Sequence, residues 1–362
     1  MPAAPAQAWS VCDNCRPTRP PRLVYSDRTL RDDRLFGQRR EESGAVNLSV
    51  ELAPRHPRGL RLRNPIMTAS GTFGYGFEYV GLVEIERLGA IVTKGTTPRP
   101  RVGSPPPRVW ETPAGLLNAI GLNNGGVEEL VRDLAPRWAG WSVPVIANLA
   151  AERLDEFVAA AARLDDAPTI AALELNVSCP NVENGLLFGC LPETAADVTR
   201  AVRDVWSRPL IVKLTPSAPD VVAVAEAVAA SGADALCMGN TYMGMAIDVE
   251  RRRPALANVS GGLSGPAIKP LTLHLVYRIA QAVDLPIIGA GGVVSAEDAV
   301  EYLMAGATAV QVGTAHFANP AAGVEIVAGL ERWLRAHGVG DVRELVGAAL
   351  PQRTRHAALA LA

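Results

Sequence analysis

The sequence predicts one α/β domain, a (β/α)8 TIM barrel with insertions at its rim. Short β-branched runs alternate with segments of helical period, there are eight such runs, and polar residues gather where the runs end. A chain of 362 residues, 48% of them hydrophobic, is long enough for one large core. The predicted strands cover residues 65–70, 90–94, 144–149, 172–178, 210–215, 235–241, 286–291 and 309–314.

Helical segments follow several of these strands. Their apolar residues recur with a period near 3.6, as on a helix that packs one face against a sheet. A doubly wound open sheet would share much of this pattern, but eight strands with intervening helices close most simply as a barrel. The predicted helices include residues 78–88, 152–164, 218–231, 296–304 and 321–337.

Three longer insertions interrupt the alternation, at residues 96–124, 180–192 and 242–266. Each insertion follows a predicted strand. In a barrel of parallel strands, the loops after the strands lie at the C-terminal rim, where enzymes of this fold assemble their active sites. We therefore expect these insertions to border a ligand site.

Charge and composition exclude several classes of partner. The 35 Lys and Arg residues nearly balance the 37 Asp and Glu residues, which gives a formal net charge of -2 and a pI near 6.3. No diffuse basic field therefore favours nucleic acid or an anionic membrane surface. No run approaches the roughly 20 apolar residues of a membrane helix, and no apolar signal-peptide stretch is visible. We expect a cytoplasmic protein that acts on a small molecule.

The two ends of the chain differ from the rest. Residues 1–45 alternate Pro, Arg, Asp and Glu without a period, and they have little apolar surface to offset the entropy of ordering. We expect a disordered extension there, or a translation start assigned too early, followed by a barrel over 46–350 and a tail over 351–362. Cys12 and Cys15 form a C-x-x-C without a second pair at zinc spacing, so we predict no metal site.

Polar side chains lie at the ends of most of the predicted strands. Any one of them could merely satisfy loop backbone groups, but together they predict a shared pocket. Amides offer paired donors and acceptors and ammonium groups neutralise negative charge, so the pocket suits a flat, polar, anionic ligand. These residues are Ser70, Lys94, Asn148, Asn176, Ser178, Cys179, Lys213, Asn240 and Thr241.

Glycines end the last two predicted strands, as Gly289-Ala-Gly-Gly292 and Val312-Gly-Thr314. Such glycines can simply turn the chain, but missing side chains also let backbone N–H groups approach a phosphate. Their place on the final two strands matches the usual phosphate site of this barrel. No G-x-G-x-x-G follows the first strand, so FMN is favoured over NAD as the bound cofactor.

Cys179 lies in Asn176-Val-Ser-Cys-Pro-Asn181, directly after the fourth predicted strand. Five cysteines scattered along a chain of this length do not indicate a disulfide framework, and most cysteines outside disulfides are buried core residues. Here the flanking residues are polar, and Pro180 ends the strand at the rim. A thiol there can act as a base or nucleophile if its pKa falls or if it meets its proton in a closed pocket.

The segment Asn176-Val-Ser-Cys-Pro-Asn-Val182 resembles the catalytic loop of class 1 dihydroorotate dehydrogenases, in which the cysteine is the base. Membrane-bound class 2 enzymes carry serine at that position. The resemblance extends from Val46 to about Leu350. Four further motifs carry it: Thr68-Ala-Ser-Gly-Thr-Phe-Gly-Tyr75, Thr93-Lys-Gly-Thr-Thr97, Asn118-Ala-Ile-Gly-Leu122 and Gly261-Gly-Leu-Ser-Gly-Pro-Ala-Ile-Lys-Pro270.

This resemblance implies an FMN enzyme that oxidises dihydroorotate to orotate in pyrimidine (UMP) biosynthesis. Cys179 would remove the C5 proton while the C6 hydride passes to the flavin. The resemblance implies FMN contacts for Ser70, Lys94, Gly95, Asn148, Asn176, Lys213, Gly239, Gly265, Gly291, Gly292, Gly313 and Thr314. It implies substrate contacts for Lys94, Asn118, Ala119, Ile120, Gly121, Leu122, Asn176, Asn181, Asn240 and Thr241.

The segment Val182-Glu-Asn-Gly-Leu-Leu-Phe-Gly189 resembles the class 1B loop. Class 1B enzymes pass electrons to a subunit that carries FAD and a [2Fe–2S] cluster and then to NAD⁺, whereas class 1A enzymes use fumarate. Because the cysteine spacing here fits no such cluster, a separate subunit is implied. We expect a homodimer of this chain joined by two electron-transfer subunits, a heterotetramer. Leu186 and Cys190 depart from the family pattern, and the sequence assigns them no role.

Four other interpretations stay open. A dihydropyrimidine dehydrogenase-like barrel shares the cysteine loop, although the Asn181 position argues against it. A dihydrouridine synthase should show a basic face and an RNA-binding domain, and neither is visible. A non-redox barrel, such as a phosphosugar isomerase or lyase, could use the glycines for a phosphate and Lys213 as its base. A flavin-binding module without turnover is disfavoured because every expected catalytic position is occupied.

Overall fold

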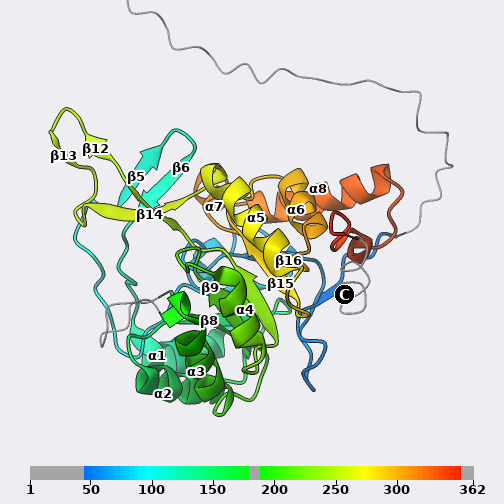
Figure 1. Cartoon of the computed structure of the whole chain (residues 1–362), viewed down its shortest axis with the longest axis horizontal. Helices are drawn as coiled ribbons and strands as arrows, with labels where there is room; N and C mark the ends of the chain where they lie inside the picture. Colours follow the sequence, from blue (N-terminus) through cyan, green and yellow to red (C-terminus); the bar gives the residue numbers. More distant parts are fainter. Residues whose placement is uncertain (1–44, 179–187, 352–362) are drawn as a thin grey trace, which may run out of the picture. The chain divides into compact units, whose positions relative to one another are not determined.

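The computed structural model describes residues 45–178 and 188–351, and their central feature is one sheet of eight parallel strands (Figure 1). Its order is β3, β16, β15, β10, β9, β8, β7, β4. A parallel bridge between Met67 and Ala90 joins the two edge strands, so the sheet closes. The predicted (β/α)8 barrel is therefore confirmed. The strands are β3 (Ile66–Thr68), β4 (Ile91–Val92), β7 (Val145–Leu149), β8 (Ile170–Asn176), β9 (Leu210–Leu214), β10 (Ala235–Met238), β15 (Ile287–Ala290) and β16 (Ala309–Val312).

All eight predicted strands are present. Several end earlier than predicted, because the polar residues after them leave the sheet at the rim; β10, for example, stops at Met238 rather than at residue 241. Nearly all residues along the strands are buried, as expected for a parallel sheet covered on both faces; the exceptions are Ala171 and Asn176 of β8. The barrel core therefore follows directly from the apolar runs in the sequence.

Helices surround the barrel, and the longer ones pack an apolar face against it (Figure 1). In α2, for instance, Phe157, Ala161 and Leu164 are buried at helical spacing. Four of the five predicted helices are confirmed, with ends that differ by up to three residues. The helices are α1 (Gly126–Glu129), α2 (Leu154–Asp165), α3 (Pro192–Arg203), α4 (Val221–Ala229), α5 (Lys269–Ile279), α6 (Ala296–Met304), α7 (Ala315–Ala318) and α8 (Ala322–Ala336).

The helix predicted over residues 78–88 is wrong. Two short 3-10 turns, Phe77–Tyr79 and Ile85–Arg87, flank an irregular segment instead. Gly81 lies between the turns with a φ of 85°, a left-handed conformation that a right-handed helix cannot contain. The apolar residues that suggested a helix, such as Ile85 and Leu88, pack into a small core cluster without a continuous α-helix.

Two of the three insertions combine into an antiparallel sheet that the sequence did not predict. The first insertion forms β5 (Val109–Thr112) and β6 (Gly115–Asn118), and the third forms β11 (Tyr242–Met245) and β14 (Ser260–Ser264). The strand order is β11, β14, β6, β5, so β14 and β6 join the two insertions. Figure 1 shows this sheet beside the barrel.

Glycine makes the contact between the two insertions possible. A Cβ on Gly261 would lie 2.5 Å from the carbonyl oxygen of Asn118, a distance that no side chain tolerates. The amide of Asn118 donates to the carbonyl of Gly262 at 3.2 Å. The pairing thus fixes the Asn118 motif beside the ends of the barrel strands.

The remaining elements are short. The hairpin of β1 (Val50–Glu51) and β2 (Arg61–Leu62) precedes the barrel, and β12 (Ile247–Asp248) pairs with β13 (Arg253–Pro254). Single turns of 3-10 or π helix cover Leu130–Leu134, Ala135–Trp138, Phe188–Cys190, Pro266–Ile268 and Val342–Leu345.

Several sequence predictions lie outside the described ranges. These are the extension with Cys12 and Cys15, most of the second insertion with Leu186, and nearly all of the tail. Cys190 is described, and its sulfur lies 3.8 Å from the carbonyl oxygen of Ser217. In the part of the chain that is described, no helix has the length and apolarity needed to cross a membrane.

The start of α6 allows a test of local stability. The Ser295 hydroxyl accepts the N–H of Asp298 at 3.2 Å, and the Asp298 carboxylate accepts the N–H of Ser295 at 2.9 Å. We expect Ser295→Ala to lower the free energy of unfolding by about 1 kcal/mol, because one backbone donor loses its partner. Urea denaturation measures this change, and an unaltered midpoint would show that the cap contributes nothing.

Candidate active site

A cavity of about 680 Å³ opens at the C-terminal ends of the barrel strands, within the size range of small-molecule sites. It gathers every predicted cofactor or substrate residue that the structure describes. Cys179 and Asn181 fall outside the described residues. The lining includes Ser70, Lys94, Gly95, Asn118, Ala119, Ile120, Gly121, Leu122, Asn148, Asn176, Lys213, Gly239, Asn240, Thr241, Gly265, Gly291, Gly292, Gly313 and Thr314.

Parallel strand ends and the insertion sheet together build this cavity. All eight strands point their carboxyl ends to one rim, which brings residues from distant parts of the chain together. The segment after β6 enters the cavity through a left-handed turn, in which φ is 72° at Gly121 and 51° at Leu122. A Cβ on Gly121 would lie 2.6 Å from the backbone nitrogen of Ser104, so only glycine fits there.

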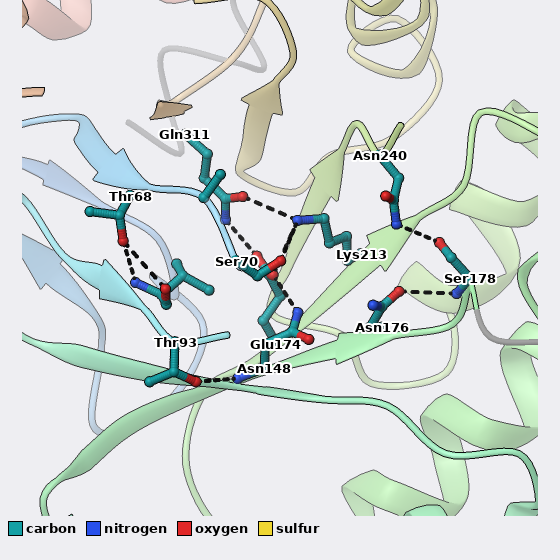
Figure 2. Close-up of polar contacts among 12 residues, drawn as sticks. Thr68, Ser70, Thr93, Asn148, Glu174, Asn176, Ser178, Lys213, Asn240 and Gln311 are labelled. Carbon is teal, nitrogen blue, oxygen red and sulfur yellow. Dashed lines mark hydrogen bonds and ion pairs between the residues drawn. The ribbon is translucent and has the colours of Figure 1, made fainter. Parts of the chain in front are cut away.

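A buried polar cluster forms one wall of the cavity, centred on Lys213 of β9 (Figure 2). Its ammonium nitrogen lies 3.1 Å from the hydroxyl oxygen of Ser70, and 3.4 Å from both a Glu174 carboxylate oxygen and the Gln311 carbonyl oxygen. Burial is the largest single influence on the pKa of Lys213 and lowers it, but the charge and hydrogen bond of Glu174, together with Cys237, raise it by more in total, so the net shift is upward. Lys213 is therefore a cation.

Sequence reasoning missed Glu174 and Gln311. Glu174 lies two positions before Asn176 on β8, so both side chains point to the same face of the strand. Gln311 interrupts the apolar strand β16 in the same way, and it donates to Glu174 at 2.5 Å. A polar residue within an otherwise apolar buried strand was the signal that could have identified both.

The side-chain amide of Asn148 on β7 has a hydrogen-bond partner at its nitrogen but none at its oxygen among the described residues. Its Nδ2 donates to Glu174 at 2.7 Å. Its Oδ1 is buried and has no hydrogen-bond partner among the described residues. A buried acceptor left alone is costly, so this atom is suited to a donor on a bound molecule.

Amides also tie the ends of β8 and β10 together (Figure 2). The Asn240 amide donates to the Ser178 hydroxyl at 2.9 Å, and the Ser178 backbone N–H donates to Asn176 Oδ1 at 3.2 Å. These contacts hold Asn176 and Asn240, both predicted to contact substrate, on one side of the cavity.

Lys94 follows β4 and supplies a second positive charge to the cavity wall. Burial lowers its pKa, the nearby Glu78 carboxylate opposes this, and the positive charge of Arg108 adds to the lowering. A partly desolvated ammonium group interacts strongly with an anionic ligand because water screens it less.

Glycines at the ends of β15 and β16 form a backbone cradle. Gly292 has a φ of 70°, and a Cβ there would lie 2.8 Å from the carbonyl oxygen of Gly265 and 2.9 Å from the backbone nitrogen of Lys269. The Thr314 hydroxyl donates to the Ser264 hydroxyl at 2.7 Å. Because these glycines carry no side chains, backbone N–H groups after the last two strands can approach a phosphate group closely. The cradle, Lys213 and the Asn148 oxygen together suit a cofactor with a phosphate group and a polar ring.

These features are those of a TIM-barrel enzyme whose rim cavity suits a phosphate-bearing cofactor and a flat, polar, anionic substrate. A family profile described as Dihydroorotate dehydrogenase matches residues 55–334. The chain belongs to the dihydroorotate dehydrogenase family.

Several relatives share the name dihydroorotate dehydrogenase B (NAD(+)), catalytic subunit. The protein from Trichlorobacter lovleyi is 53% identical over 302 residues, which cover 83% of this chain and 98% of the relative. The protein from Geotalea daltonii is 52% identical with the same coverage, and that from Desulforudis audaxviator is 53% identical over 80% of this chain and 95% of its own. The predicted resemblance to the class 1B catalytic subunit is thus confirmed. Which cavity residues contact the cofactor and which contact the substrate stays a prediction.

Proposed function

We propose that this chain is the catalytic subunit of an NAD⁺-linked dihydroorotate dehydrogenase, which oxidises (S)-dihydroorotate to orotate in pyrimidine biosynthesis. The observation that carries the proposal is that one cavity gathers every residue that was predicted to contact cofactor or substrate and that the structure describes. The printed name of the B-type relatives supports the same reaction and acceptor. It also favours this reading over the dihydropyrimidine, dihydrouridine and non-redox alternatives.

The proposed cofactor is FMN, which when bound supplies a hydride acceptor. The Gly291–Gly292 and Gly313–Thr314 backbone would hold its phosphate. Ser70, Asn148 and Lys213 would hold its ring, since they offer an acceptor, a free amide oxygen and a cation in one wall. A cation there also stabilises negative charge as the flavin is reduced.

The substrate would contact the cavity residues that carry a second cation and three side-chain amides. Lys94 would neutralise its carboxylate, and the amides of Asn118, Asn176 and Asn240 would pair with the imide edge of the ring. In this proposal Cys179 takes the C5 proton as a general base.

The proposed electron route leaves this chain through a second protein. The term catalytic subunit in the relatives' name supports a separate electron-transfer subunit. We propose that this subunit carries FAD and a [2Fe–2S] cluster, that two copies join a homodimer of this chain, and that the assembly is cytoplasmic.

Anaerobic mixing of the purified holoprotein with dihydroorotate tests this function. We expect the flavin absorbance near its visible maximum to bleach rapidly with dihydroorotate and to stay unchanged with dihydrouracil. The reduced protein should then be reoxidised by NAD⁺ only after the electron-transfer subunit is added. Reoxidation by fumarate alone would instead place the chain in class 1A, and a flavin that ignores dihydroorotate would refute the proposed reaction.

A further inference from the structure

Glu174 belongs to the polar cluster around Lys213 but is not among the residues that line the cavity. One carboxylate oxygen accepts from Asn148 Nδ2 at 2.7 Å and from Lys213 Nζ at 3.4 Å, and the other accepts from Gln311 Nε2 at 2.5 Å (Figure 2). Its side chain is 0% exposed. A carboxylate this deeply buried is costly unless it is fully paired, and three partners from three other strands pair it here.

The first consequence concerns the orientation of the Asn148 amide. An ionised carboxylate only accepts hydrogen bonds, so Asn148 must present its Nδ2 to Glu174. The carbonyl oxygen Oδ1 is thereby turned away from Glu174. It lies 3.1 Å from the position that a Cβ on Gly95 would occupy, beside a cavity-lining glycine. Glu174 thus determines that this wall offers an acceptor rather than a donor.

The second consequence concerns Lys213. Burial alone would lower the pKa of its ammonium group, and the charge of Glu174 counteracts that effect. Ser70 and Gln311 complete the shell around the ammonium nitrogen with neutral oxygen atoms. Without Glu174, therefore, a buried ammonium group in the cavity wall would lack any counter-charge in this cluster.

We propose that Glu174 is a positioning residue for the cofactor, which it serves by turning the Asn148 carbonyl toward the cavity and by holding Lys213 as a fixed cation. Gln311 donates a hydrogen bond to the second carboxylate oxygen and so fixes the Glu174 rotamer. A flavin ring carries an N–H donor for the first group and electron-rich carbonyl and nitrogen atoms for the second. This inference rests on the proposed function, because it takes FMN as the ligand.

The test is Glu174→Gln, which keeps the size of the side chain and removes its charge. We expect FMN to bind the variant apoprotein about 10- to 100-fold more weakly, as is typical when a residue that orients a ligating group is lost. The midpoint potential of bound flavin should become more negative, because an uncompensated Lys213 loses its charge and no longer stabilises reduced flavin. Fluorescence titration with FMN and anaerobic redox titration measure the two quantities.

The matched control is Asp234→Asn, another carboxylate-to-amide change. Asp234 precedes β10 at the other end of the barrel, where it accepts from Arg203 at 2.9 Å and from the N–H of Leu210 at 2.8 Å. We expect this variant to bind FMN as the wild type does. An equal loss of FMN affinity in both variants would overturn the proposal, because a general packing defect would then explain the result.

Other outcomes are equally decisive. Wild-type affinity and potential in Glu174→Gln would refute the role of Glu174, and so would a more positive potential, since Glu174 would then act through its own charge. If Glu174→Gln does not fold, Gln311→Met tests the same cluster, and unchanged FMN affinity there would refute the proposal. Wild-type protein that binds no FMN would instead refute the proposed function, which separates the two failures.

Discussion

Replacing Cys179 with alanine is expected to slow the reduction of bound flavin by dihydroorotate about 10²- to 10⁴-fold, the usual contribution of a positioned general base. Alanine cannot accept the C5 proton, whereas the residues proposed to bind the substrate are unchanged. The dissociation constant for dihydroorotate should therefore stay close to that of the wild type. Anaerobic stopped-flow absorbance measures both quantities in one concentration series.

Cys190→Ala is the matched control, since it removes a thiol from the insertion that directly follows Cys179 and carries no proposed role. We expect it to reduce flavin at the wild-type rate. Cys179→Ser should fall between the wild type and the alanine variant, because a hydroxyl is a weaker base at neutral pH. A Cys179→Ala protein with the wild-type rate would remove Cys179 from the mechanism.

Replacing Lys213 with methionine should lower the free energy of unfolding by about 3–5 kcal/mol, because the buried Glu174 carboxylate then loses its positively charged partner and keeps only neutral ones. Methionine preserves much of the length of the side chain but none of its charge. We also expect the purified variant to be colourless, since the cation proposed to face FMN is gone. Chemical denaturation and the flavin content of the purified protein measure the two effects.

The double variant Lys213→Met/Glu174→Gln tests the cause of that instability. Removing both charges should recover most of the lost stability, while FMN binding stays impaired. In the wild type burial lowers the pKa of Lys213, but Glu174 and Cys237 together raise it by more, so the net shift is upward. The raised pKa of Lys213 therefore adds stability that is fully present below about pH 10.4, the usual lysine pKa in an unfolded chain. This contribution is lost as the pH rises through the higher pKa of Lys213 in the folded protein. An equally unstable double variant would show that packing, not charge, causes the loss.

Local patterns in the sequence were enough to predict the barrel and most of its site. Apolar runs predicted all eight strands, since a parallel strand covered on both faces must be apolar along its length. Because parallel strands end at one rim, polar residues such as Lys94, Asn148 and Asn240 had to meet there. The glycines after β15 and β16 indicated a phosphate cradle for the same reason.

Other features depended on contacts between residues far apart in the chain. The insertion sheet pairs Asn118 with Gly262 across 144 positions, and no local period signals such a pairing. Gln311 reaches Glu174 across 137 positions, so the polar cluster exists only once the barrel has closed. At Gly81 a single left-handed residue outweighed the helical composition around it. The sequence by itself therefore determined the fold and the rim residues, whereas tertiary contacts decided how the insertions pair and which buried carboxylate orients Asn148 and Lys213.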